Sequence, residues 1–300
     1  MDRVKKSIHY NCPSTIKDGN RGKGTGIVVF DTGAALHPDI RNQIVCFRDI
    51  LHGRITPYDD CGHGTHVCGI IAGNGKASRK KYAGIAEDAS LIVLKVLGEH
   101  GDGNVEDILK GVHWVINHYR KYRIKIANLS VGAGFDLDLE KEKNLLEAVE
   151  EMWNLGIAVI VSAGNLGPEK GTITIPGNSK KVITVGAMER TGKLMEHSGR
   201  GPTESCVVKP DIVTVGQNII SCNYLYGKNQ KNILPYCIKS GTSMATPVVS
   251  GAAALYFSKY PERTNVELKL KLRQTCERFP INDGSGWGAL RVDRLLENKN

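Results

Sequence analysis

The sequence predicts a single α/β domain with a doubly wound, mainly parallel sheet that is covered by helices on both faces. Apolar, β-branched runs of strand length recur along the 300 residues, and stretches with apolar residues at i, i+3, i+4 and i+7 lie between them. Strands that alternate with helices build a mainly parallel sheet. No repeat or linker divides the chain, and its 41% hydrophobic residues allow one large core.

The expected elements follow from these runs in chain order. The expected strands are 25–31, 90–97, 124–131, 157–164 and 181–187. Apolar stripes predict helices from Val105 to Tyr119 and from Leu145 to Trp153, and two further helices begin near His63 and Ser243. Two short apolar runs between 218 and 240 flank a polar stretch, which predicts a hairpin at an edge of the sheet.

Composition excludes several classes of protein. The formal net charge is +9, but the basic residues occur in scattered pairs, so we expect a solvated basic surface and no nucleic-acid partner. No run approaches the ~18 apolar residues of a membrane span. The first residues lack the apolar centre of a signal peptide. Eight cysteines without regular spacing predict mostly reduced thiols.

Asp31 ends the first expected strand, in the run VVFDTG. An Asp-Thr-Gly triplet also serves aspartic proteases, but their chemistry needs two carboxylates that share one proton. No second triplet occurs, since NDGSG at 282–286 has the wrong order, so an aspartic protease would require a homodimer. In doubly wound folds, ligands bind beyond the carboxyl ends of the strands. We therefore expect Asp31 and Asn165, which follows another strand, to lie at one site.

His63 and Ser243 offer a different chemistry for Asp31. His63 stands between glycines in CGHGTHVCG, and Ser243 lies in SGTSMATPVVSG. A serine hydroxyl is a poor nucleophile until an imidazole removes its proton, and the imidazole needs a carboxylate to fix its tautomer. Asp31, His63 and Ser243 supply these three groups, and we expect them at one cleft.

These segments resemble the subtilisin-like serine proteases, the subtilases. Four blocks match the family in order over about residues 24–295: VVFDTGAALHPD, GHGTHVCG, VSAGN and SGTSMATPVVSG. The resemblance implies a serine endopeptidase acting on polypeptides, with Asn165 and the backbone N–H of Ser243 donating to the oxyanion. It also implies that an extended substrate binds by strand addition. The substrate-binding residues it implies are Gly101, Gly103, Ser130, Val131, Gly132, Ala163 and Gly164.

Metal binding is the main competing hypothesis for the histidine block. Cys61, His63, His66 and Cys68 have the ligand types of a zinc site, but on a helix beginning near His63 they point in different directions. We therefore expect no metal there, a structural His66 and a buried Cys68. Cys61 and Cys68 also depart from the family pattern, which predicts sensitivity to thiol reagents.

Calcium binding and a catalytically silent fold are two further hypotheses. Asp39 matches an aspartate that many subtilases use as a calcium ligand, but the basic run 79–81 disfavours a dication, so we expect no required cofactor. A catalytically silent subtilase fold could act as a binding or regulatory protein. The intact Asp31, His63, Asn165 and Ser243 count against a silent fold.

The start of the chain bears on location. We expect residues 1–21 to form an N-terminal extension and residues 22–300 the catalytic domain. With 30 residues before Asp31, the chain resembles the intracellular branch of the family and predicts a cytoplasmic protease. The competing hypothesis is the mature part of a secreted precursor.

Overall fold

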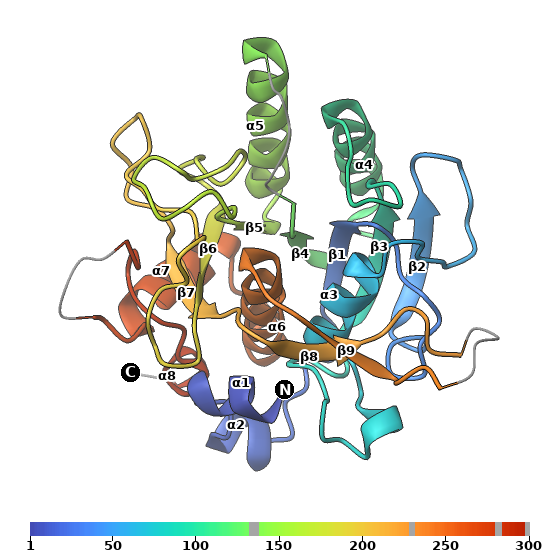
Figure 1. Cartoon of the computed structure of the whole chain (residues 1–300). Coiled ribbons are helices and arrows are strands. Elements are labelled where there is room, and N and C mark those ends of the chain that lie inside the picture. The colour runs from blue at the N-terminus through green and yellow to red at the C-terminus, as the bar shows by residue number, and fades with distance from the viewer. Residues whose placement is uncertain (132–137, 228–231, 280–283, 298–300) are drawn as a thin grey trace.

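Seven parallel strands form the centre of the molecule (Figure 1). The computed structural model of the chain describes residues 1–131, 138–227, 232–279 and 284–297. The strand order is β2-β3-β1-β4-β5-β6-β7, and every pairing is parallel, which confirms the predicted sheet. The strands are β1 (Gly26–Asp31), β2 (Ile44–Asp49), β3 (Ser90–Lys95), β4 (Ile124–Leu129), β5 (Ala158–Ser162), β6 (Ile183–Met188) and β7 (Ile212–Val215).

Helices cover both faces of the sheet. Helices α3 and α6 pack together on one face, and α4 and α5 pack together on the other (Figure 1). The main helices are α3 (His63–Ala72), α4 (Val105–His118), α5 (Leu139–Asn154), α6 (Thr242–Lys259) and α7 (Asn265–Thr275). The shorter ones are α1 (Asp2–Ser7), α2 (Pro13–Ile16), the 3₁₀ turn η1 (Lys76–Ser78) and α8 (Val292–Leu296).

Strand β1 and helix α6 are both deeply buried at the centre of the molecule. All six residues of β1 are buried, because the strand has helices on both faces. Helix α6 is buried over most of its length, and its small residues, such as Gly251, allow close packing: a Cβ at Gly251 would lie 2.5 Å from Ile85 Cβ. These two elements fix where Asp31 and Ser243 lie.

Two edge strands and the hairpin differ from the sequence-based expectation. Strands β2 and β7 were not expected: β2 is only partly buried, β7 has four residues, and each forms one edge of the sheet. The hairpin is present as β8 (Ile219–Cys222) and β9 (Tyr236–Lys239), but as a separate antiparallel sheet. It packs on α3 rather than extending an edge of the main sheet, and the Ser221 hydroxyl donates to the His66 carbonyl at 2.8 Å.

The N-terminal residues belong to the same core. Val4, Ile8 and Tyr10 are buried in the main hydrophobic cluster, and the Val292 N–H donates to the Ile8 carbonyl at 2.8 Å. Helices α1 and α2 lie at the bottom of the view in Figure 1, beside α8. Among the described residues, no helix combines the length and apolar character needed to cross a membrane.

Candidate active site

The four residues expected at one site come from four different elements. Asp31 is the last residue of β1, His63 is the first residue of α3, and Ser243 lies in the first turn of α6. Asn165 follows β5 by three residues. A cleft of about 450 Å³ is lined by His63, Asn165 and Ser243, while Asp31 lies buried behind His63. The topology therefore gathers all four at the carboxyl edge of the sheet.

Asp31 and His63 form a direct pair. His63 Nδ1 lies 2.7 Å from Asp31 Oδ1, and the same carboxylate oxygen accepts the Thr32 N–H at 2.8 Å. A carboxylate only accepts, so Nδ1 carries the proton and Nε2 of the neutral ring is left as the base. The Asp31 side chain has no exposed surface, whereas the His63 side chain is 23% exposed. The carboxylate thus fixes the tautomer of a ring that borders the cleft.

Gly64 makes this close approach sterically feasible. A Cβ at Gly64 would lie 2.1 Å from the Gly33 carbonyl oxygen and 3.1 Å from Asp31 Oδ1. Any larger residue would push the first turn of α3 away from the end of β1. The glycine after the histidine is therefore required by the packing of α3 against β1.

Asp59 holds the start of α3 and was not predicted from the sequence. Its buried carboxylate accepts hydrogen bonds from the N–H groups of Gly62 and Thr65, at 2.8 and 2.9 Å, and from the Thr65 hydroxyl at 2.6 Å. It also accepts the Thr32 hydroxyl at 2.9 Å, which ties the helix to the residue after Asp31. Burial raises the pKa of Asp59, but these hydrogen bonds outweigh it, so the net pKa lies below its ordinary value.

The two histidines of α3 have opposite electrostatic environments. Burial by itself lowers the pKa of His63, but the charge and hydrogen bond of Asp31 outweigh it, and the net pKa is raised. Burial, followed by the charges of His63 and Lys239, lowers the pKa of His66 to about 3. His66 has no exposed surface, and its Nε2–H donates to the Ile219 carbonyl at 3.1 Å. The structural role expected for His66 is confirmed, as is the burial of Cys68.

Thr242, the first residue of α6, joins Asn165 to the helix start that carries Ser243. The Ser243 hydroxyl donates to the Ser130 carbonyl at 3.0 Å, and no hydrogen bond joins it to His63 in the described part of the chain. Asn165 Oδ1 accepts both the N–H and the hydroxyl of Thr242, each at 3.1 Å. An amide whose oxygen is anchored in this way has its NH₂ group left to donate elsewhere, and Asn165 is an exposed residue that lines the cleft.

The walls of the cleft contain most of the residues expected to bind substrate. Gly101, Gly103, Ser130, Val131 and Gly164 line it together with His63, Asn165 and Ser243. Ala163 does not: it is fully buried, and its N–H donates to the Val185 carbonyl at 2.9 Å. Gly132 lies outside the described residues. The cleft also contains residues that the sequence did not indicate, among them Ser162 and Lys239.

A buried lysine connects two parts of the site. Lys95, at the end of β3, has no exposed surface, and its ammonium lies 2.6 Å from Asp60 Oδ1. The same ammonium donates to the carbonyls of Thr32 and Leu97, each at 2.9 Å. It therefore joins the turn after Asp31 to the segment 97–103 that borders the cleft.

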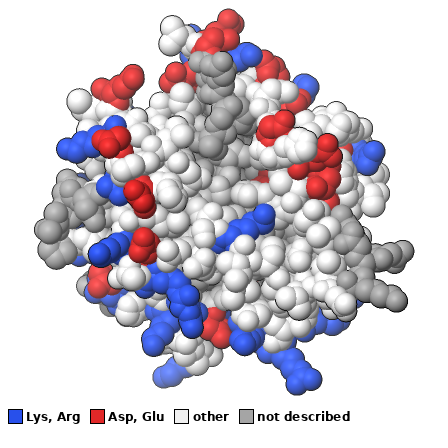
Figure 2. All heavy atoms as spheres, in the orientation of Figure 1, with Lys and Arg blue, Asp and Glu red and all other residues white. Residues whose placement is uncertain are grey.

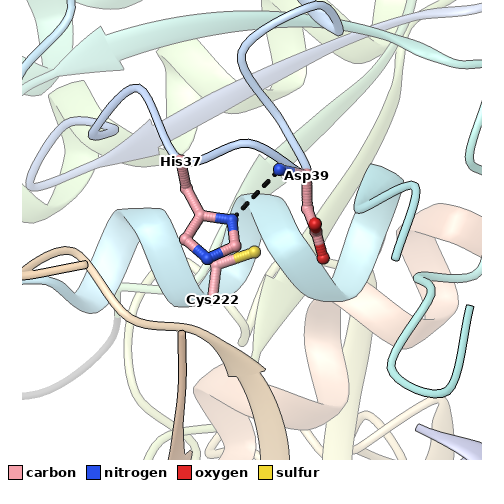
Figure 3. A group of neighbouring side chains, drawn as sticks. All are labelled: His37, Asp39 and Cys222. Atoms are coloured by element: carbon pink, nitrogen blue, oxygen red, sulfur yellow. Dashed lines mark hydrogen bonds between the residues drawn. The ribbon is translucent and has the colours of Figure 1, made fainter. Parts of the chain in front are cut away.

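Both carboxylate oxygens of Asp39 already accept hydrogen bonds from the protein. Its Oδ1 accepts the Ala77 N–H at 2.8 Å, and its Oδ2 accepts the Tyr236 hydroxyl at 2.6 Å. Its neighbours are His37, from the same loop, and Cys222 of β8, with donor atoms that all lie within 4.8 Å of one another (Figure 3). Calcium prefers oxygen ligands, and a histidine and a thiol do not suit it.

The polar atoms of His37 are also engaged. Its Nδ1 accepts the Asp39 N–H at 3.1 Å, drawn as the dashed line in Figure 3, and its Nε2–H donates to the Pro235 carbonyl at 2.8 Å. Burial raises the pKa of the Cys222 thiol well above its ordinary value, which disfavours the thiolate that binds metals. Hydrogen bonds of His37 to Pro235 and of Asp39 to Tyr236 therefore join the loop after β1 to the hairpin.

The cysteines of the histidine block lie in different surroundings. Cys61 is partly exposed and lines the cleft, whereas Cys68 is fully buried, and burial raises its pKa well above the ordinary value. All eight cysteines of the chain are unpaired. His63 pairs with Asp31 and His66 with Ile219, so the four residues considered for zinc do not share one direction.

Comparison with known proteins shows that the chain is similar to several proteases. The sequence matches the model of the subtilase family over residues 22–288. It is 41% identical over 289 residues to the serine protease AprX of Bacillus subtilis (strain 168), covering 91% of this chain and 65% of that protein. It is 35% identical to the major intracellular serine protease of the same organism, covering 81% of this chain and 71% of that protein.

A solved structure shows the same architecture. The fold matches that of Sphericase with a TM-score of 0.78 and 30% identity, covering 90% of this chain and 92% of that chain. The chain spans about two thirds of the length of the AprX protein, 65%.

Proposed function

This chain belongs to the subtilase family, and from that membership and the geometry of the cleft we propose that it is a serine endopeptidase that hydrolyses polypeptides. The observation that carries the proposal is the 2.7 Å pair of His63 Nδ1 and Asp31, which leaves Nε2 as a base in a cleft shared with Ser243. Asp31 thus acts as the partner of an imidazole, whereas an aspartic-protease mechanism has no role for His63.

The reaction is acyl transfer through Ser243. Its hydroxyl, which donates to the Ser130 carbonyl in the free protein, turns about χ1 and gives its proton to His63 Nε2. The serine oxygen then bonds to the carbonyl carbon of the substrate, and Asp31 stabilises the resulting imidazolium. His63 passes the proton to the amine nitrogen as the C–N bond breaks, and water hydrolyses the ester by the same steps.

Asn165 and the start of α6 are proposed to stabilise the oxyanion. Thr242 anchors Asn165 Oδ1, so the Asn165 NH₂ group is the part of the amide left for substrate. The Ser243 N–H lies in the first turn of a helix, where backbone donors have no intrahelical acceptor and the helix dipole favours negative charge. Two donors aimed at the developing charge lower the barrier of acyl transfer.

Substrates are proposed to be extended polypeptides, with no cofactor required. Gly101, Gly103, Ser130 and Val131 line the cleft, and two of them are glycines without a side chain to block the approach of an extended peptide, which suits binding by strand addition. We expect no nucleic-acid partner. Figure 2 shows acidic side chains gathered toward the top of this face and basic ones toward the bottom, around a centre with few charges, rather than one basic stripe.

The N-terminal extension and the compartment complete the proposal. Residues 1–21 are proposed to stabilise the catalytic domain, residues 22–300, because Val4, Ile8 and Tyr10 are buried in its core and residues 1–21 do not line the cleft. A cytoplasmic location is supported by eight unpaired cysteines, since oxidising compartments favour disulfides. Fractionation of the producing cells tests the location.

The experiment that tests the proposal measures hydrolysis of peptide anilides and unfolded protein. Wild-type chain should cleave both, and Ser243→Ala should not. Ser258→Ala, at the far end of α6, is the matched control and should retain activity, because its hydroxyl donates only to the Lys23 carbonyl, at 2.9 Å. A wild-type chain that is folded but inert would instead favour the silent, binding form of the fold.

A further inference from the structure

Lys239 places a positive charge in the cleft that the proposed mechanism does not use. It is the last residue of β9, four positions before Ser243, and it lines the same cavity as His63 and Ser243. The residue is half-buried, and within the described ranges its side-chain ammonium makes no hydrogen bond or ion pair with another residue. An ammonium group on a cleft wall without a protein carboxylate is available to a bound ligand.

The backbone of Lys239 is held firmly on the helix that carries His63. In the β8–β9 ladder Lys239 pairs with Ile219, whose carbonyl accepts a hydrogen bond from His66 Nε2 at 3.1 Å. The next residue, Ser240, accepts the Asn218 N–H at 2.8 Å through its hydroxyl. The charge of Lys239 also acts on the rings of both His63 and His66. Lys239 therefore stands on the His63 side of the cleft.

The chemistry of the reaction says which part of the substrate passes this side. The segments 101–103 and 130–131 line the cleft and are proposed to hold the acyl part of an extended substrate, as the family resemblance implies. The leaving amine, in contrast, must reach His63 to take its proton. The residue directly after the cleaved bond therefore lies beside His63, within reach of the long side chain of Lys239. We propose that Lys239 selects substrates with Asp or Glu directly after the cleaved bond. The proposal rests on the proposed function.

The remaining charged groups of the site do not offset this preference. Asp31 and Asp59 are buried, and each carboxylate already accepts hydrogen bonds from the protein. Asp102 is exposed and also lines the cleft, but it belongs to the segment proposed to hold the acyl part. An acidic residue is thus favoured after the cleaved bond and disfavoured near Asp102, which gives the cleft a polarity.

The test uses fluorogenic peptides that differ only in the residue after the cleaved bond: Glu, Gln or Lys. We expect kcat/KM for Glu to exceed that for Gln by about tenfold in the wild type, as for a partly desolvated charge pair, and to fall with added salt. Lys239→Met keeps the apolar stem and should make Glu and Gln equal. Lys239→Glu should make Lys the preferred residue. Lys259→Met, at the far end of α6, is the matched control and should keep the wild-type preference.

The outcomes separate this inference from the proposed function. Active-site titration with a fluorophosphonate counts the correctly folded enzyme in each preparation, so kcat/KM is compared per active molecule. Lys239→Gln serves if Lys239→Met does not fold. An active wild type that cleaves Glu and Gln peptides equally overturns the role of Lys239 and leaves the protease intact. A chain that cleaves none of the peptides and is not labelled overturns both.

Discussion

His66 should make the folded chain sensitive to acid. It is fully buried beside the catalytic block, and burial, followed by the charges of His63 and Lys239, lowers its pKa to about 3. In the unfolded chain the same ring is expected to titrate near its ordinary value of about 6.5. Between these two pH values the unfolded state binds one proton more than the folded state, so the free energy of unfolding falls as the pH falls.

The size of the effect follows from the two pKa values. The unfolded value of 6.5 and the folded value of about 3 bound the pH window, and one pH unit corresponds to about 1.36 kcal/mol. His66 alone should therefore remove up to about 5 kcal/mol of stability between pH 6.5 and pH 3, a large part of the ~5–15 kcal/mol that holds a typical domain together. The slope should approach about 1.4 kcal/mol per pH unit inside the window.

The assay is urea unfolding at pH 7, 6, 5 and 4, carried out in the Ser243→Ala background to prevent self-digestion. His66→Gln should be less stable than the parent at pH 7 by about 1–3 kcal/mol, because it disturbs a buried hydrogen bond. The gap should close as the pH falls, since the variant lacks the titrating ring. His113→Gln, at an exposed position of α4, should keep the parent slope. Parallel stability curves for His66→Gln and the parent would refute the reasoning.

Three further predictions concern activity. Asn165→Ala should lower kcat about a hundred- to a thousandfold with little change in KM, a magnitude already known for the corresponding asparagine of a subtilisin. An unchanged kcat would show that Asn165 does not stabilise the oxyanion. The pKa of His63 is raised, and only the neutral ring can accept the serine proton, so kcat/KM should fall as the pH drops through a value above 6.5. A maximum of kcat/KM near pH 4 would contradict the role of His63 as the base. Iodoacetamide should reduce activity through Cys61, which lines the cleft, so Cys61→Ser should resist the reagent; equal inactivation of that variant would place the reactive thiol elsewhere.

The sequence revealed the parts of the fold that are buried on every side. Strand β1 and helix α6 were predictable because their continuous apolar and small residues are typical of elements that are buried on all sides. Strands β2 and β7 were missed because an edge strand has partners on one side only, so β2 can mix exposed and buried positions and β7 can stop after four residues. The hairpin was recognised, but its contact with α3 depends on tertiary packing that a local pattern does not contain.

The residues of the candidate site also fall into two groups, those that the sequence indicated and those that only the structure revealed. Asp31, His63, Asn165 and Ser243 stand in short blocks whose residue types already require one another chemically, and the structure brings them to one edge of the sheet. Asp59 was not identified from the sequence because its carboxylate binds backbone N–H groups. Those groups point toward it only once the first turn of α3 has formed. Ala163 does not line the cleft, because it is fully buried and its N–H continues the pairing with β6 through the Val185 carbonyl.

The most direct measurement of the proposed chemistry is covalent labelling of Ser243. A fluorophosphonate should modify Ser243 alone, as located by mass spectrometry, and hydrolysis of peptide substrates should be lost in proportion to labelling. His63→Ala should greatly slow the labelling, because the hydroxyl then lacks its base. Labelling at another residue, or activity that survives in Ser243→Ala and is blocked by a pepstatin-type inhibitor, would contradict the assignment of Asp31, His63 and Ser243.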